Sequence, residues 1–216
     1  MRWPAERTLS IEAARRQQRE LAARVREAWE LSAISTIAGV DVSVRGERAA
    51  AAVVVFAWPS LAELERSVCT GAVEFPYVPG LLAFREVPLL VRAVEALRVR
   101  PDLLLVDGHG RAHPRRCGVA SHLGVILGLP TIGSGKSRLC GAYRTPAARR
   151  GASTRLVHDG EVVARVLRTR EGVAPLFVSI GHRVDLAHAV RIVLRATRGT
   201  RLPEPIRAAH AAAGSA

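Results

Sequence analysis

An acidic residue, Asp107, stands where a run of apolar residues ends in glycine. Residues 103–106 read Leu-Leu-Leu-Val, which is typical of a short, fully buried strand. Gly108-His109-Gly110 interrupts that strand, and glycine lets backbone approach a ligand that a Cβ atom would exclude. Catalytic groups are common on loops at strand ends, so we expect this carboxylate to face a cleft. The alternative is an ordinary strand-to-helix turn with Asp107 as its cap. The residues that follow include His113, whose imidazole can titrate, and Arg115 and Arg116, whose positive charges can bind phosphate.

Two further acids can join Asp107 in a cluster. Residues 36–44 alternate as a strand does, and Asp41 interrupts that otherwise apolar strand, where a carboxylate is costly unless it is paired, hydrogen-bonded or bound to a metal. If the two strands are neighbours, Asp41 and Asp107 meet, and Glu86 approaches them from a covering helix. On its own, Glu86 would be only favourable charge near a helix start. Clustered carboxylates repel one another, and Mg²⁺ relieves that repulsion. The pattern favours metal-assisted hydrolysis of a phosphodiester.

Lys136 is the one lysine among 32 basic residues, the rest being arginine. Lysine differs from arginine as a compact point charge whose pKa the protein can tune, although chance survival of one lysine is the alternative. The surrounding Gly-Ser-Gly-Lys-Ser suggests a phosphate-binding loop, but such a loop needs glycine where this chain has Pro130, so we reject a nucleoside triphosphate site. We expect a glycine-rich turn that places Lys136 beside the end of a short strand, where it can steady the phosphate under attack.

An aromatic side chain lies on a stiff loop. Pro76-Tyr77-Val78-Pro79 brackets the tyrosine with two prolines, which restrict the backbone and remove its hydrogen-bond donors. In a basic protein such a residue is a candidate for stacking on bases or wedging between them. The alternative is a tyrosine that simply packs against its own loop.

The elements that must position these residues form one α/β domain over residues 1–216. We expect an antiparallel meander of three strands, at residues 36–44, 50–57 and 64–73, beside shorter strands in a mixed sheet flanked by helices. An amphipathic helix is expected over residues 9–31 because Leu21, Val25 and Trp29 recur at helical spacing, and it serves either the substrate groove or packing alone. The tail beyond about residue 210 is expected to fray. Further helices are expected at residues 81–97, 117–127 and 184–196, and further strands at 103–106, 154–157, 162–169 and 176–180.

Composition bounds the class of protein. The formal charge of +13 indicates a polyanionic partner, and with nearly half of its residues apolar the chain is not disordered. Three cysteines without paired spacing argue against a disulfide framework or a zinc cluster and fit a reducing compartment. No signal peptide is visible, and the longest apolar run, residues 49–58, is far short of the roughly 20 residues needed to span a bilayer. We therefore expect a soluble, cytoplasmic protein with no membrane partner, acting as a monomer.

Six motifs in order resemble the endonuclease V family, over about residues 38–210. They are GVDVS (39–43), YVPGLLAFRE (77–86), PDLLLVDGHGRAHPRRCGVASHLGV (101–125), PTIGSGKSRL (130–139), SIGHRVDLAHA (179–189) and LPEPIRAAH (202–210). The resemblance implies a ribonuclease H-like fold and Mg²⁺-dependent cleavage of DNA that contains deoxyinosine, with Mn²⁺ expected to substitute. The cut falls at the second phosphodiester 3′ to the lesion and leaves a 3′-hydroxyl and a 5′-phosphate.

The resemblance also assigns roles to residues of this chain. Metal-binding aspartates fall on Asp41 and Asp107, and the remaining catalytic positions fall on Glu86, Lys136 and His210. The wedge that enters the damaged strand falls on Pro76, Tyr77, Val78 and Pro79. The pocket for the flipped base falls on Gly80, Leu82, Gly108, Gly110 and His113, which agrees with the need for closely approaching backbone at a flipped base. Val44 and Ser134-Gly135 depart from the family's usual residues, which bears on rate or substrate breadth more than on the chemistry.

Two other functions stay open at this point. One is a nuclease of the same mechanism that acts on inosine in RNA, a distinction resting on 2′-hydroxyl contacts. The other is a basic nucleic-acid-binding protein whose acids are structural and which does not cleave.

Overall fold

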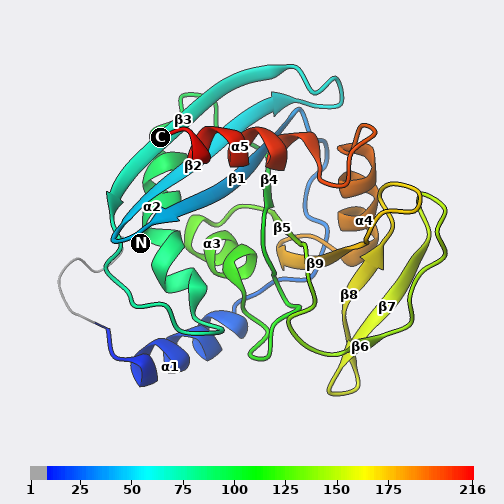
Figure 1. Cartoon of the computed structure of the whole chain (residues 1–216), viewed down its shortest axis with the longest axis horizontal. Coiled ribbons are helices and arrows are strands. Elements are labelled where there is room, and N and C mark those ends of the chain that lie inside the picture. The colour runs from blue at the N-terminus through cyan, green and yellow to red at the C-terminus, as the bar shows by residue number, and fades with distance from the viewer. Residues whose placement is uncertain (1–8) are drawn as a thin grey trace.

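The structure, a computed structural model, describes residues 9–216, and within them nine strands form one mixed sheet (Figure 1). The strands are β1 Thr36–Arg45, β2 Arg48–Ala57, β3 Glu63–Ala72, β4 Leu103–Val106, β5 Thr131–Gly135, β6 Ala142–Tyr143, β7 Ser153–His158, β8 Glu161–Leu167 and β9 Leu176–His182. The helices are α1 Ile11–Ala22, α2 Leu82–Glu95, α3 Val119–Leu127, α4 Leu186–Arg195 and α5 Glu204–Gly214. The sheet order is β3-β2-β1-β4-β5-β9-β8-β7-β6.

The predicted mixed α/β sheet is confirmed, including its meander. β1, β2 and β3 pair antiparallel, whereas β4 lies parallel to β1 and β5 parallel to β4. β9 then pairs antiparallel with β5, and β8, β7 and β6 continue outward. The strand that ends in Asp107 is therefore the neighbour of the strand that carries Asp41, which is the condition that the predicted acidic cluster required.

Alternate residues of the central strands pack in two separate hydrophobic cores, because successive side chains along a strand point to opposite faces of the sheet. Ile37, Leu103 and Leu105 belong to the core covered by α4 and α5. Ala38, Leu104 and Val106 belong to the core covered by α2 and α3. The helices thus lie on both faces of the sheet, with α5 crossing over β1 and β2 (Figure 1).

The N-terminal helix is shorter than predicted. α1 runs from Ile11 to Ala22 rather than over residues 9–31, with Ser10 as its N-cap. Beyond it the backbone of Arg26 bonds to the segment after β9, since its carbonyl accepts from Arg183 N at 2.7 Å and its N–H donates to His182 Nδ1 at 3.2 Å. Val25 and Trp29 still pack against the core, but from an irregular segment. The spacing of these apolar residues correctly predicted that they pack on the core, but the predicted continuation of the helix beyond Ala22 is wrong.

The predicted frayed tail is also wrong. α5 continues to Gly214, and Ala212 and Ala213 are buried against the sheet. A run of small residues, which looks featureless in the sequence, here lets the helix lie close to β1 and β2.

The glycine-rich segment before Lys136 is a strand and not a turn. β5 extends through Gly135, and all five of its residues are buried. Lys136 follows immediately, so its expected place beside a strand end is confirmed. Between residues 9 and 216, no helix is both long and apolar enough to cross a membrane.

Candidate metal and nucleic-acid site

The two aspartates meet where β1 and β4 run side by side. Val40 pairs with Val106, so Asp41 and Asp107 are the next residues on each strand. The register is continued by Asp107 N, which donates to Val40 O at 3.3 Å. Both carboxylates are largely buried, with side chains 12% and 8% exposed. Burial, followed by the charge of Asp107, raises the pKa of Asp41.

His210 reaches this pair from α5. Its Nδ1 lies 2.7 Å from Asp41 Oδ2, although 169 positions separate the two residues. Two residues before Asp41, Gly39 lies on the same face of β1, where a Cβ atom would stand 1.9 Å from Pro205 O at the start of α5. The glycine is therefore what allows α5 to cross β1 closely enough for His210 to arrive.

Asp41, Asp107 and His210 each offer a ligand atom, and these atoms all lie within 4.8 Å of one another. Carboxylate oxygens suit Mg²⁺ and Mn²⁺, and one imidazole nitrogen is compatible with Mn²⁺ as well. Asp107 Oδ2 is buried, and its partner is the ammonium group of Lys136. A buried carboxylate oxygen that lies against a positive charge, inside a triad of ligand atoms, fits a divalent cation.

Glu86 is not part of this triad, but Asp41 and Asp107 are close enough for their charges to act on it. It is carried by α2, which packs on the other face of the sheet. Burial, and then the charges of Asp41 and Asp107, raise the pKa of its carboxyl from 4.5 to about 8. The side chain therefore holds a proton at neutral pH when no cation is bound, because a third negative charge beside two aspartates is unfavourable.

Lys136 lies directly against the acids. Its Nζ is 2.5 Å from Asp107 Oδ2, while 40% of the lysine side chain remains exposed. Behind it, Gly135 packs against the ring of His109, where a Cβ atom would lie 2.3 Å from Cε1. Gly135 thus makes room for the half-buried ring of His109, whose pKa is lowered by burial.

The loop predicted to act as a wedge, residues 76–79, is exposed but anchored at its base. Tyr77 is 71% exposed, and Pro76 and Pro79 are also exposed. Just before them, buried Phe75 packs against Phe84 with ring centroids 5.5 Å apart, and Val78 packs on the same cluster. An outward aromatic on a fixed base is the arrangement that insertion between bases requires.

The carbonyl of Gly80, which follows the wedge, accepts from three side chains. They are His113 Nε2 at 3.0 Å, Arg115 Nη2 at 2.7 Å and Gln18 Nε2 at 3.1 Å. Arg115 N also donates to His113 Nδ1 at 3.0 Å, so the imidazole is neutral with its proton on Nε2. Burial, and then the charge of Arg115, lower the pKa of His113 to about 4, in agreement with that tautomer.

The remaining predicted pocket residues, Gly108, Gly110 and Leu82, differ in whether they border accessible space. Gly110 is packed against β9, where a Cβ atom would stand 1.9 Å from Ile180 O, and its N–H donates to Ser179 Oγ at 2.9 Å. A Cβ atom at Gly108 would meet only Val119, at 3.7 Å. Leu82 is 39% exposed. Gly110 therefore holds the loop on the sheet, whereas Gly108 and Leu82 face accessible space.

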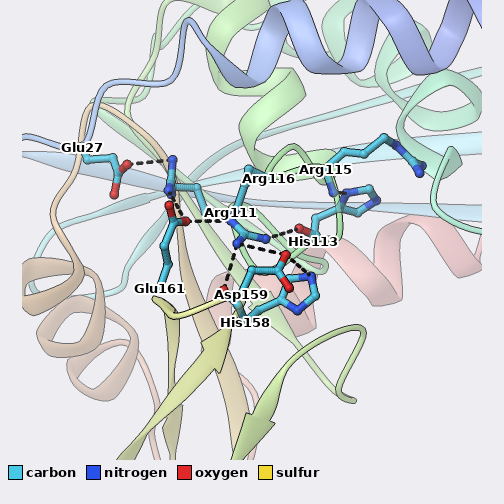
Figure 2. A network of polar contacts seen from close by, with 8 residues as sticks. All are labelled: Glu27, Arg111, His113, Arg115, Arg116, His158, Asp159 and Glu161. Atoms are coloured by element: carbon cyan, nitrogen blue, oxygen red, sulfur yellow. Dashed lines mark hydrogen bonds and ion pairs between the residues drawn. The ribbon is translucent and has the colours of Figure 1, made fainter.

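A network of ion pairs holds the same loop from outside (Figure 2). Arg111 lies 2.7 Å from Glu27 and 3.4 Å from Glu161. Arg116 contacts Glu161 at 2.9 Å and Asp159 at 3.7 Å, at the turn of the β7–β8 hairpin. Single exposed pairs contribute little stability. Their combined effect is to fix the loop between β4 and α3, which carries several of the candidate residues.

Two residues that position the site were not predicted. Gln18 is 1% exposed and joins α1 to the wedge loop and to Cys117 O, at 2.6 Å from its Nε2. Phe75 anchors the wedge. A polar residue on the apolar stripe between Ala14 and Leu21 was the available signal for Gln18, and an aromatic just before the proline-bracketed tyrosine was the signal for Phe75.

The family model and the most similar relatives of this chain belong to one family. The family model for endonuclease V matches residues 19–211. Endonuclease V of Roseiflexus sp. (strain RS-1) is 50% identical over 98% of this chain and 93% of its own. The crystal structure of endonuclease V from Streptomyces avermitilis superposes with a TM-score of 0.91 and 44% identity, covering 99% of this chain and 93% of that one.

A more distant structure contains nucleic acid. Endonuclease V from Ciona intestinalis, 28% identical with a TM-score of 0.83, was crystallised with a 24mer DNA containing an inosine followed by a ribo-adenosine. The similarity covers 95% of this chain and 96% of that one.

Proposed function

Since the chain belongs to the endonuclease V family and is a nuclease of that family, we propose that it repairs DNA by cutting beside deoxyinosine with the help of Mg²⁺. The bond cut is the second phosphodiester 3′ to the lesion, and the products are a 3′-hydroxyl and a 5′-phosphate. The observation that carries the proposal is the convergence of Asp41, Asp107 and His210, with Lys136 2.5 Å from Asp107. The relative crystallised with inosine-containing DNA supports the choice of lesion.

Asp41, Asp107 and His210 would hold the cation, and Mn²⁺ can replace Mg²⁺ because one of the three donors is a nitrogen. When bound, the cation supplies Lewis-acid stabilisation of charge on the phosphate and activation of water. The site lies in a chain of formal charge +13, so an acidic pocket is surrounded by a surface that attracts the polyanion.

Lys136 acts on the phosphate itself. Its ammonium group is partly exposed and held beside Asp107, so it can bind a phosphate oxygen as negative charge builds up there. Hydrolysis adds water oxygen to phosphorus and breaks the bond to O3′, which leaves with a proton. Glu86, protonated at neutral pH without a cation, is close enough to Asp41 and Asp107 to hold or release a proton beside them.

Lesion selection belongs to the loop before α2. Tyr77 enters the damaged strand and stacks on the neighbouring base, supported from below by Phe75. The flipped base occupies the space beside Gly80, Leu82, Gly108 and His113. Gly110 contributes by keeping its loop against β9 rather than by touching the base, since its N–H is already bonded to Ser179 Oγ.

The test is nicking of a labelled duplex with a single deoxyinosine, with and without Mg²⁺, beside Asp107→Asn. Asp107→Asn keeps the shape of the side chain and removes its charge. We expect a Mg²⁺-dependent nick one nucleotide beyond the lesion, absent in the variant. Cutting of an inosine-containing RNA but not of the DNA would overturn the substrate and keep the mechanism. Tight binding without cutting of either would overturn the mechanism.

A further inference from the structure

Three arginines gather where α1 meets the loop that contains Gly80. Arg15 and Arg19 are exposed one turn apart on α1, and Arg115 lies on the loop between β4 and α3. The three groups are close, because Arg115 Nε donates to Oε1 of Gln18, which lies on α1 between Arg15 and Arg19. After burial, the charges of Arg15 and Arg19 lower the pKa of Arg115. Among residues 9–216, no carboxylate forms an ion pair with any of them. Unpaired like charges of this kind repel one another unless an anion lies between them.

Arg115 is held in place for a ligand. Its Nε donates to Gln18 Oε1 at 2.5 Å and its Nη2 to Gly80 O at 2.7 Å. Gln18 in turn is buried, with its amide bonded to Gly80 O and Cys117 O. Within the described chain this leaves Arg115 Nη1 without a hydrogen-bond partner. A guanidinium fixed on one edge and open on the other is prepared to bind phosphate at little cost in side-chain entropy.

We propose that Arg15, Arg19 and Arg115 form a second phosphate-binding site, the α1 basic site, for the backbone of the nucleic-acid strand beside the wedge. The inference rests on the proposed function, because the strand bound at this site is the strand whose damaged base enters the pocket. Gly80 directly follows the wedge, and its carbonyl accepts a hydrogen bond from Arg115 of the α1 basic site. Gly80 therefore connects the wedge to the basic site. A strand opened by Tyr77 therefore has backbone phosphates within reach of α1.

The simpler explanation is that α1 merely has a solvated basic face, and the chain offers a matched control. Arg16 and Arg24 are also exposed, on α1 and just after it, and neither is among the charges that lower the pKa of Arg115. Arg15→Ala/Arg19→Ala and Arg16→Ala/Arg24→Ala remove the same total charge from the same part of the molecule. All four side chains are exposed, so both double variants are expected to fold.

The measurement is binding of a fluorescent duplex carrying one deoxyinosine, in chelator so that nothing is cut, at KCl from about 50 to 200 mM. Loss of two phosphate contacts should reduce the slope of log affinity against log salt by about 1.8 and weaken binding on the order of tenfold or more at the lowest salt. The control pair should keep nearly the wild-type slope. Equal slopes in the two double variants would overturn the proposal. The readout is independent of cleavage, so a protein that fails to cut deoxyinosine would refute the proposed function and leave this test valid.

Discussion

The carboxyl group of Glu86 should make the metal-free protein lose stability as pH rises. Its pKa is raised from 4.5 to about 8 by burial and by Asp41 and Asp107, so between these values the folded protein binds more protons than the unfolded chain. The contribution of this group to the free energy of unfolding is fully present below about pH 4.5 and is lost as pH rises toward 8. At about 1.4 kcal/mol for each pKa unit, the loss is on the order of 5 kcal/mol.

Glu86→Gln keeps the size of the side chain and cannot ionise. We expect the variant to be less sensitive to pH than wild type, and more stable than wild type near pH 8, by several kcal/mol. The assay is urea unfolding in the presence of a chelator, at a series of pH values across this window. Glu95→Gln is the matched control, since Glu95 is an exposed acid at the other end of α2.

Mg²⁺ supplies a second test on the same samples. A cation that binds only the folded state stabilises it, and it must compete with protons for the acidic cluster. Mg²⁺ should therefore stabilise wild type strongly near pH 8 and weakly near pH 5. Parallel pH curves for wild type and Glu86→Gln in chelator would show that Glu86 does not sense the two aspartates, and would refute the reasoning.

Three further predictions concern the other parts of the site. Lys136→Arg keeps the charge but replaces a compact ammonium with a planar group, so single-turnover cleavage should slow by roughly tenfold to hundredfold; a near wild-type rate would remove the special role of this lysine. Tyr77→Ala should reduce the preference for deoxyinosine over undamaged duplex by about tenfold, because one stacked base contributes about 1–3 kcal/mol, while cleavage of bound substrate changes little; an unaltered preference in competition binding would contradict the wedge role. Gly39→Ala places a methyl group 1.9 Å from Pro205 O, so it should cost more than about 2 kcal/mol in urea unfolding and also weaken Mg²⁺ binding through displacement of His210; a wild-type unfolding midpoint would show that α5 does not depend on this glycine.

The sequence by itself predicted the central part of the sheet and most of the acidic cluster. Four consecutive apolar residues before Asp107, and alternation around Asp41, are local patterns set by the period of a strand and by the cost of burying a carboxylate. β1, β4 and their side-by-side pairing agree with that prediction. The two prolines around Tyr77 suggested the wedge, and the motifs shared with endonuclease V added His210, which periodicity alone does not reveal.

The tertiary structure alone decided which face each residue serves and where the helices end. His210 reaches Asp41 because α5 crosses β1 over Gly39, a contact that depends on helix packing and not on neighbouring sequence. α1 ends at Ala22, and beyond it the backbone of Arg26 bonds to residues more than 150 positions away. Gln18 likewise belongs to the site through contacts between distant segments, since its amide bonds to Gly80 O and Cys117 O. Local periodicity records whether a residue is buried, but the partner that buries it, and the polar groups that the partner brings, are set only when distant segments pack together.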